Sequence, residues 1–194
     1  MPDFISNYLE IRGDAKTLRA LKTRLGKPSP INRGGAEEGW EQGAVFSLLN
    51  IVRPPKSQWR EYMNSDDGTF NYNWNCTHWG TKWDVERSTR LAKAERLLYD
   101  FRTPWTPPDL ALLELSRLYP TVAICNDYEG EMESNGYPNG CTLYKGGKRR
   151  RKLREFGSAC FKPYKVHSPI VESPDDDSLE NLFPKDTNNK EMPP

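Results

Sequence analysis

Apolar positions at the start of the chain predict a strand followed by a helix. Residues 7–12 alternate apolar with polar or charged side chains, which is the pattern of a half-buried strand. Leu18, Leu21 and Leu25 then recur at helical spacing. Asp14 precedes this stripe, and its carboxylate can accept a hydrogen bond from a free backbone N–H at the helix start. A β–α unit is therefore expected first.

The middle of the chain is less regular. The apolar run 44–52 predicts a second, buried strand, which the prolines at 54–55 would end because proline cannot donate to a strand ladder. Residues 56–63 predict a short helix that carries two aromatic side chains. Residues 85–94 are charged, and we expect them to form a helix or a loop.

A second strand–helix unit follows. In residues 95–102, Tyr99 and Phe101 alternate with charged side chains, which favours a strand, although helical spacing competes. Thr106 followed by the prolines at 107–108 predicts a helix start, because proline fits the first helical turn and threonine can cap it.

Three further segments complete the pattern. Residues 121–127 and 141–144 predict strands, with a polar loop at 129–140 between them. The glycines at 146–147 predict a turn that would bring residues 149–156 back beside the preceding strand.

This order of elements indicates an α+β fold of the ferredoxin-like kind, with an antiparallel sheet covered by two helices on one face. We expect a single domain over residues 1–165. It would contain a Trp-rich insertion at about 53–94 and a basic hairpin at about 141–156. Residues 166–194 are rich in Pro, Asp and Asn, and we interpret them as an acidic, polar C-terminal tail.

Composition and the first residues predict where in the cell the protein is found. Charged residues make up 28 % of the chain, and no apolar run approaches the roughly 18 residues of a membrane-spanning helix. The first residues lack the features of a secretory signal, so a cytoplasmic protein with reduced cysteines is expected.

Charge is unevenly distributed, although the net charge is only +1. Residues 145–154 hold seven cations and no acids, whereas residues 172–194 hold seven acids and two lysines. The basic run can neutralise phosphates of a nucleic acid, dock a protein or the chain's own acidic tail, or have no binding role. The candidate residues are Lys148, Arg149, Arg150, Arg151 and Lys152.

The least common motif is the hexapeptide Trp79–Asp84, WGTKWD, followed by YDFRTPWTPP at 99–108. Together these segments resemble a family of phage- and plasmid-encoded accessory proteins that have a YubB-like, ferredoxin-like domain. The resemblance covers mainly residues 79–127 and implies both the fold and a role in a mobile genetic element. The family has no agreed catalytic residues, so the resemblance assigns none here.

The tryptophans around this motif allow two interpretations. In one, the indoles fill the core, Lys82 and Asp84 pair across a bend, and Trp105 packs on the following helix. In the other, they form an aromatic pocket for a flat ligand such as a nucleotide base. The candidate binding residues are Trp74, Trp79, Lys82, Trp83, Asp84 and Trp105.

Motifs for catalysis or metal binding are weak. Cys76 and His78 could contribute to a zinc site only if other ligands joined them, and their spacing matches no standard zinc signature. The carboxylates at 66–67 and from Asp127 onward are more typical of solvated loops than of an acid–base pair. We therefore expect no catalytic residue, no metal and no cofactor.

Three functional hypotheses follow. The first is a non-enzymatic phage or mobile-element protein that binds a host protein and inhibits a defence system. The second is a nucleic-acid-binding module that uses residues 145–154. The third is a pocket protein that sequesters or cleaves a nucleotide signal.

Overall fold

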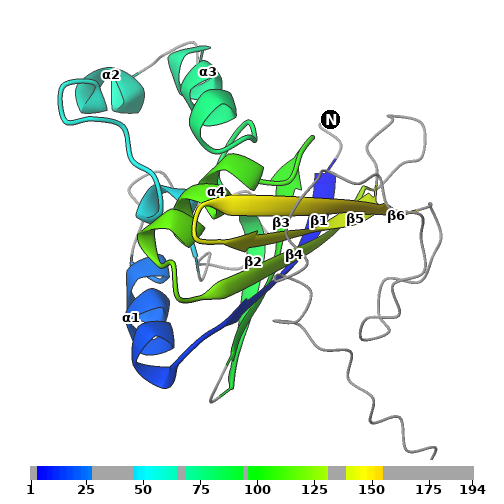
Figure 1. The fold of residues 1–194 in the computed structure, drawn as a ribbon. Coiled ribbons are helices and arrows are strands. Elements are labelled where there is room, and N and C mark those ends of the chain that lie inside the picture. Colours follow the sequence, from blue (N-terminus) through cyan, green and yellow to red (C-terminus); the bar gives the residue numbers. More distant parts are fainter. Residues whose placement is uncertain (1–3, 28–45, 65–68, 94–95, 131–138, 155–194) are drawn as a thin grey trace, which may run out of the picture.

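The computed structural model describes residues 4–27, 46–64, 69–93, 96–130 and 139–154, and the expected tail at 166–194 lies outside them. These residues form one six-stranded antiparallel sheet in the order β2-β3-β1-β4-β5-β6 (Figure 1). The strands are β1 (Phe4–Arg12), β2 (Glu86–Lys93), β3 (Arg96–Pro104), β4 (Ala123–Gly130), β5 (Asn139–Lys145) and β6 (Lys148–Arg154). The helices are α1 (Ala15–Leu25), η1 (Leu48–Asn50), α2 (Trp59–Asn64), α3 (Thr69–His78) and α4 (Asp109–Leu118).

The ferredoxin-like prediction is confirmed. The elements β1, α1, β2, β3, α4 and β4 follow one another along the chain, and their strands lie in the order β2-β3-β1-β4, all antiparallel. Strands β5 and β6 continue the sheet beyond β4, and Lys145 pairs with Lys148 across the predicted glycine turn.

Helices α1 and α4 pack on the same face of the sheet. Leu21 of α1 and Leu112 of α4 are fully buried in one cluster with Ile11, Phe101 and Ile124, which come from three neighbouring strands. Because successive side chains of a strand point to opposite faces, this cluster marks the helix-covered face. Burial of these apolar side chains is the main stabilising contribution to the fold.

Helix α1 begins as its sequence predicts. The side chain of Asp14 accepts a hydrogen bond from the backbone N–H of Thr17 at 2.9 Å. Gly26 ends the helix, and its N–H donates to the carbonyl of Lys22. The predicted cap is confirmed, and it satisfies one of the N–H groups that a helix start leaves without an intrahelical partner.

The predicted strand at 44–52 is wrong over the residues that the structure describes. Leu48–Asn50 form a single 3-10 turn, because the side chain of Ser47 accepts from Leu49 N–H and the Asp84 carboxylate accepts from Leu48 N–H. Phe46 is fully buried against the rings of Tyr99 and Phe101. The apolar run therefore fills the core beneath the helices, an outcome that a short apolar run does not distinguish from a strand.

The second ferredoxin strand comes instead from Glu86–Lys93, for which we expected a helix or a loop. Among the described strands it pairs with β3 alone, and it lies at one end of the strand order. Charged residues are common on such edge strands because they discourage pairing with other chains. Because of this composition, apolar alternation does not identify the segment as a strand.

The insertion between α1 and β2 carries two helices. Helix α2 confirms the predicted short helix, whereas α3 was not predicted. Asparagine and aromatic residues give α3 a weak helical propensity. Its position is fixed by contacts instead, since the ring of Trp74 lies 5.3 Å from that of Tyr62 and 5.6 Å from that of Trp79.

Helix α4 starts later than its sequence suggests. Its first residue is Asp109, the preceding Pro108 makes no side-chain cap, and the Thr106 hydroxyl donates elsewhere, to the carbonyl of Gly80. The predicted threonine cap is therefore wrong. Among the described helices, none is both long enough and apolar enough to cross a membrane.

Candidate functional site

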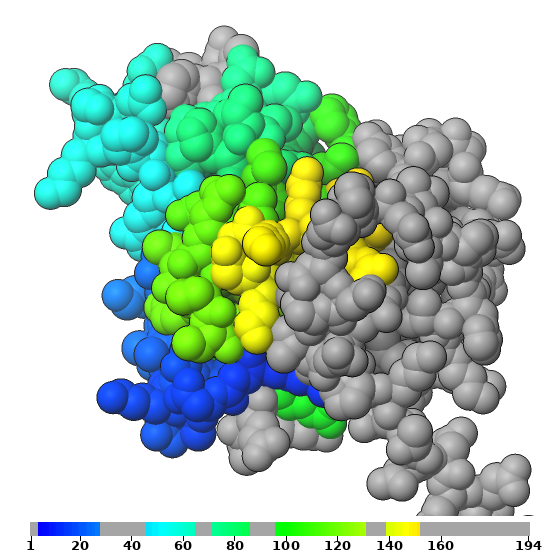
Figure 2. Space-filling model, in the orientation of Figure 1, coloured from blue at the N-terminus to red at the C-terminus, as the bar shows by residue number. Residues whose placement is uncertain are grey.

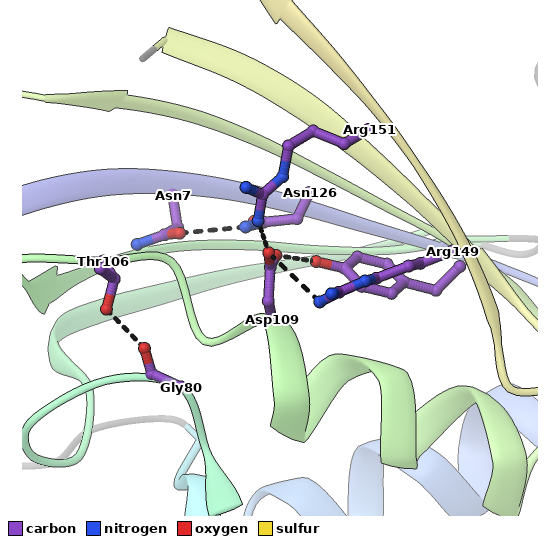
Figure 3. A network of polar contacts seen from close by, with 8 residues as sticks. Asn7, Gly80, Thr106, Asp109, Asn126, Arg149 and Arg151 are labelled. Carbon is purple, nitrogen blue, oxygen red and sulfur yellow. Dashed lines mark hydrogen bonds and ion pairs between the residues drawn. The ribbon is translucent and has the colours of Figure 1, made fainter. Parts of the chain in front are cut away.

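The two motif segments that are about twenty residues apart in the sequence lie against each other in the structure. The hydroxyl of Thr106 donates to the carbonyl of Gly80 (Figure 3), and the hydroxyl of Thr81 donates to the carbonyl of Pro104 at 2.8 Å. The N–H of Ala111, in the first turn of α4, donates to the carbonyl of Trp79 at 3.3 Å. These bonds fix residues 79–84 to the loop that joins β3 to α4.

Gly80 makes this contact possible. Its φ is +83°, and a Cβ added there would lie 3.3 Å from the backbone nitrogen of Leu110. A side chain would therefore meet both backbone strain and the start of α4.

We expect Gly80→Ala to lower the free energy of unfolding by about 3 kcal/mol, because the left-handed conformation and the close backbone contact both oppose a Cβ. Gly146→Ala is the matched control. It has a φ of +56° and no atom within 4 Å of the added Cβ, so only strain remains, about 1 kcal/mol. Chemical denaturation of both variants measures the difference. Equal losses would contradict a role for the contact with α4.

The tryptophans of the predicted pocket divide into two groups. Trp79 is 0 % exposed and its indole N–H donates to the carbonyl of Val52 at 3.0 Å, while Trp74 is 6 % exposed. The ring of His78 stacks on Trp74 with centroids 4.2 Å apart. For Trp74 and Trp79 the pocket interpretation is wrong, because these indoles belong to the core and leave almost no area for a ligand.

The second group surrounds Lys82. Its ammonium nitrogen lies 4.3 Å from the ring centroid of Trp105, 5.1 Å from that of Trp83 and 5.2 Å from that of Tyr72. All four side chains are half-buried. They come from α3, from the hexapeptide and from the loop before α4. We call this set the Lys82 cluster (Tyr72, Lys82, Trp83 and Trp105).

Trp105 has the backbone feature that distinguishes the Lys82 cluster. Its φ is +65°, and no other non-glycine residue in the described ranges has a positive φ. A bulky side chain in this region of φ is strained, and such strain persists only where surrounding structure enforces it, often at functional positions. The enforcing contacts are the hydrogen bonds of its neighbours, Pro104 and Thr106, to residues 80 and 81.

Asp84 does not pair with Lys82, so the predicted ion pair is wrong. The Asp84 carboxylate is buried and accepts hydrogen bonds from the hydroxyl of Ser47 and from the N–H groups of Leu48 and Val85. Burial raises the pKa of Asp84, against the opposing effect of these hydrogen bonds. Its role is structural, since it joins the 3-10 turn to the end of the hexapeptide.

The basic run forms β6, and strand geometry separates its side chains. Arg149 and Arg151 pair with Tyr144 and Thr142 of β5, whereas Arg150 pairs with Leu143. Because neighbouring side chains point to opposite faces, Arg149 and Arg151 share the helix-covered face and Arg150 does not. The candidates Lys148 and Lys152 belong to the same strand. The run is therefore not one continuous patch.

Arg149 and Arg151 converge on Asp109, the first residue of α4 (Figure 3). Arg149 Nη1 lies 3.7 Å from the carboxylate, Arg151 also forms an ion pair with it, and the buried hydroxyl of Tyr144 donates to it. Burial raises the pKa of Tyr144 well above its usual value and lowers the pKa of Arg151. These contacts attach β6 to α4, and the hairpin adjoins that helix on the surface in Figure 2.

No group of three His, Cys, Asp or Glu side chains in the described ranges is arranged to hold a metal ion. Cys125 lies on β4 and Cys141 on the neighbouring strand β5. Their sulfur atoms are 3.0 Å apart, and both side chains are buried. Cys76 and His78 both lie on α3, where Nδ1 of the His78 ring lies 2.9 Å from the carbonyl oxygen of Trp74 and donates to it in the tautomer that carries a proton on Nδ1.

Sequence reasoning missed Tyr72, Asp109 and Tyr144. Tyr72 lies on the helix that was not predicted, so no spacing argument could bring it to Lys82. Asp109 follows two prolines and resembles an ordinary first-turn acid, which favours the positive end of a helix dipole. Only the order of strands shows that β6 passes beside it.

The comparisons with known proteins support the fold. No family model matches the chain, and no curated protein matches it. Among solved structures, the chain is similar to the crystal structure of protein api92 from Yersinia pseudotuberculosis, which is assigned to DUF1281. The TM-score is 0.53 at 12 % identity, over 81 % of this chain and 99 % of that one. At this identity the likeness shows a shared fold and nothing further.

Proposed function

We propose that this protein is a non-enzymatic accessory protein of a phage or other mobile element, which binds a host protein in the host cytoplasm and inhibits a defence system. The setting rests on the resemblance of residues 79–84 and 99–108 to that family of accessory proteins. The choice of a binding role rests on the Lys82 cluster, whose side chains are half-buried.

The observation that carries the proposal is the conformation of Trp105. Its indole is half-buried at the surface, although the backbone beneath it is strained at a φ of +65°. A tryptophan that only stabilised the fold would gain more from burial, as Trp79 does. Rigid tryptophan side chains with a partly apolar surface are frequent anchors of protein interfaces.

The test is capture from lysates of bacterial hosts after nuclease treatment, with the immobilised full-length protein. We expect the wild type to retain a host protein and Trp105→Ala to lose it, because the indole supplies the central contact area. Tyr119→Ala is the control. Tyr119 is a half-buried aromatic residue at the opposite end of α4 and stacks with Arg24. Equal retention by wild type and Trp105→Ala would contradict the proposal.

Nucleic-acid binding is the second candidate, and one observation favours it. The side chains of Arg149 and Arg151 lie on one face and are 46 % and 45 % exposed despite their contact with Asp109. In the same experiment without nuclease, nucleic acid retained by the wild type and lost by the paired Arg149→Gln and Arg151→Gln variant would support this function.

A further inference from the structure

The ammonium group of Lys82 has an unusual environment. Three aromatic rings surround it at 4.3 to 5.2 Å from their centroids. Among the residues that the structure describes, no carboxylate, carbonyl or hydroxyl forms a hydrogen bond or ion pair with it. Ring faces attract a cation, but they satisfy none of its three N–H donors. A hydrogen-bond acceptor from outside these residues would complete the site.

The surroundings favour one carboxylate over a phosphate as this acceptor. Phosphate sites in proteins usually combine arginine forks with several free backbone N–H groups. Here the N–H of Gly80 donates to the carbonyl of Asn75, and the N–H of Thr106 donates to that of Pro104. The Lys82 cluster offers one compact charge between apolar walls, which matches the single charge of an Asp or Glu side chain.

We infer that Lys82 is the charged centre of the proposed recognition surface and pairs with an Asp or Glu carboxylate of an acidic protein segment. This inference rests on the proposed function and names the chemistry of the partner. Tyr72, Trp83 and Trp105 would surround the pair and exclude water from it. An ion pair shielded in this way contributes more to the binding free energy than an exposed one, because the local dielectric constant is lower.

The inference can be tested without knowing the partner. The probe is a hexaglutamate peptide, titrated into the ¹⁵N-labelled full-length protein while the indole N–H signals are followed by NMR. Trp83→Phe and Trp105→Phe variants assign the two signals. The indole of Trp79 is an internal reference, because its side chain is fully buried and its N–H donates to the carbonyl of Val52.

We expect the Trp83 and Trp105 signals to shift with hexaglutamate and not with hexaglutamine of equal length. The Lys82→Met variant keeps an unbranched chain between the rings and removes the charge, so its shifts should fall about tenfold or more. Unchanged shifts in Lys82→Met, equal shifts with hexaglutamine, or no shift with hexaglutamate would each overturn the inference. A larger shift with a six-residue thymidine oligonucleotide would also overturn it, in favour of a phosphate.

This outcome is separable from that of the proposed function. If a host protein is captured by the wild type and lost by Trp105→Ala, but Lys82→Met binds it as tightly as the wild type, the function stands and the carboxylate contact is refuted. If hexaglutamate shifts the indoles in a Lys82-dependent way while Trp105→Ala captures the same host proteins as the wild type, the proposed recognition surface is refuted and the acidic-ligand site remains.

Discussion

Trp79→Ala is expected to lower the free energy of unfolding by about 4 kcal/mol, which is a large fraction of the roughly 5–15 kcal/mol that stabilises a typical domain. The indole is 0 % exposed, and its ring lies 5.6 Å from that of Trp74 and 6.5 Å from that of Tyr62. Alanine would leave a cavity beside Tyr62 of α2 and Trp74 of α3. It would also remove the donor to the partly buried carbonyl of Val52.

Urea denaturation of the purified variant measures this loss, and two further variants make the result specific. Trp79→Phe keeps most of the apolar volume but loses the hydrogen bond to Val52, so a smaller loss, about 2 kcal/mol, is expected. Trp105→Ala removes an indole of the same size from the surface and should change stability by about 1 kcal/mol or less. A loss below about 1 kcal/mol in Trp79→Ala would contradict the core assignment.

Asp84→Ala is the second large effect, with an expected loss of about 3 kcal/mol. The carboxylate is 5 % exposed and holds Ser47, Leu48 and Val85 together. Without it, two backbone N–H groups in the core lose their acceptor. Asp84→Asn keeps an oxygen acceptor and an isosteric shape, so its loss should be about 1 kcal/mol. Similar losses in both variants would contradict the hydrogen-bond account.

The sign of the pH dependence follows from the raised pKa of Asp84. Folding favours the protonated carboxyl, so its contribution to stability is fully present below the unfolded pKa of about 4. That contribution falls as pH rises through the folded pKa and is constant above it. The stability of the wild type relative to Asp84→Asn should therefore decrease with rising pH over this window. A difference that does not change with pH, or that increases, would contradict burial as the dominant cause.

Several helices and strands of the fold were predictable because their residues have clear local patterns. The cap at Asp14, the leucine stripe of α1 and the alternation around Tyr99 each match the observed element. The segment forms the strand β3, and not the helix that its spacing also allowed, because alternation places Leu97, Tyr99 and Phe101 on the buried face. These signals depend on neighbours in the sequence, which is why sequence alone was sufficient.

The second strand was not predictable from such signals. Residues 44–52 have the composition of a buried strand, but their backbone groups find partners in Ser47 and Asp84 instead of a neighbouring strand. Residues 86–93 have the composition of a solvated segment, yet they pair with β3. In both cases tertiary contacts that are distant in sequence outweighed local preference.

The candidate site was predicted in part. The hexapeptide and the loop at 104–108 were recognised from their residues, and they do meet. The sequence did not show which side chains of these segments point into the core. Trp79 and Asp84 point into the core while Lys82 lies among rings at the surface, because Gly80 bends the chain at a φ of +83°. Alternation along an extended segment would have placed Lys82 and Asp84 together.

The central claim is that the Lys82 cluster is a recognition surface and not a structural contact. The most direct test compares the affinity of Trp105→Ala for its partner with the stability of the folded variant. The measurement is the dissociation constant of the captured host protein, determined under conditions in which the wild type and the variant are both folded. We predict that Trp105→Ala weakens binding about 30-fold or more while the Tyr119→Ala control binds as the wild type does. An affinity for the host protein that is unchanged in Trp105→Ala would contradict the claim.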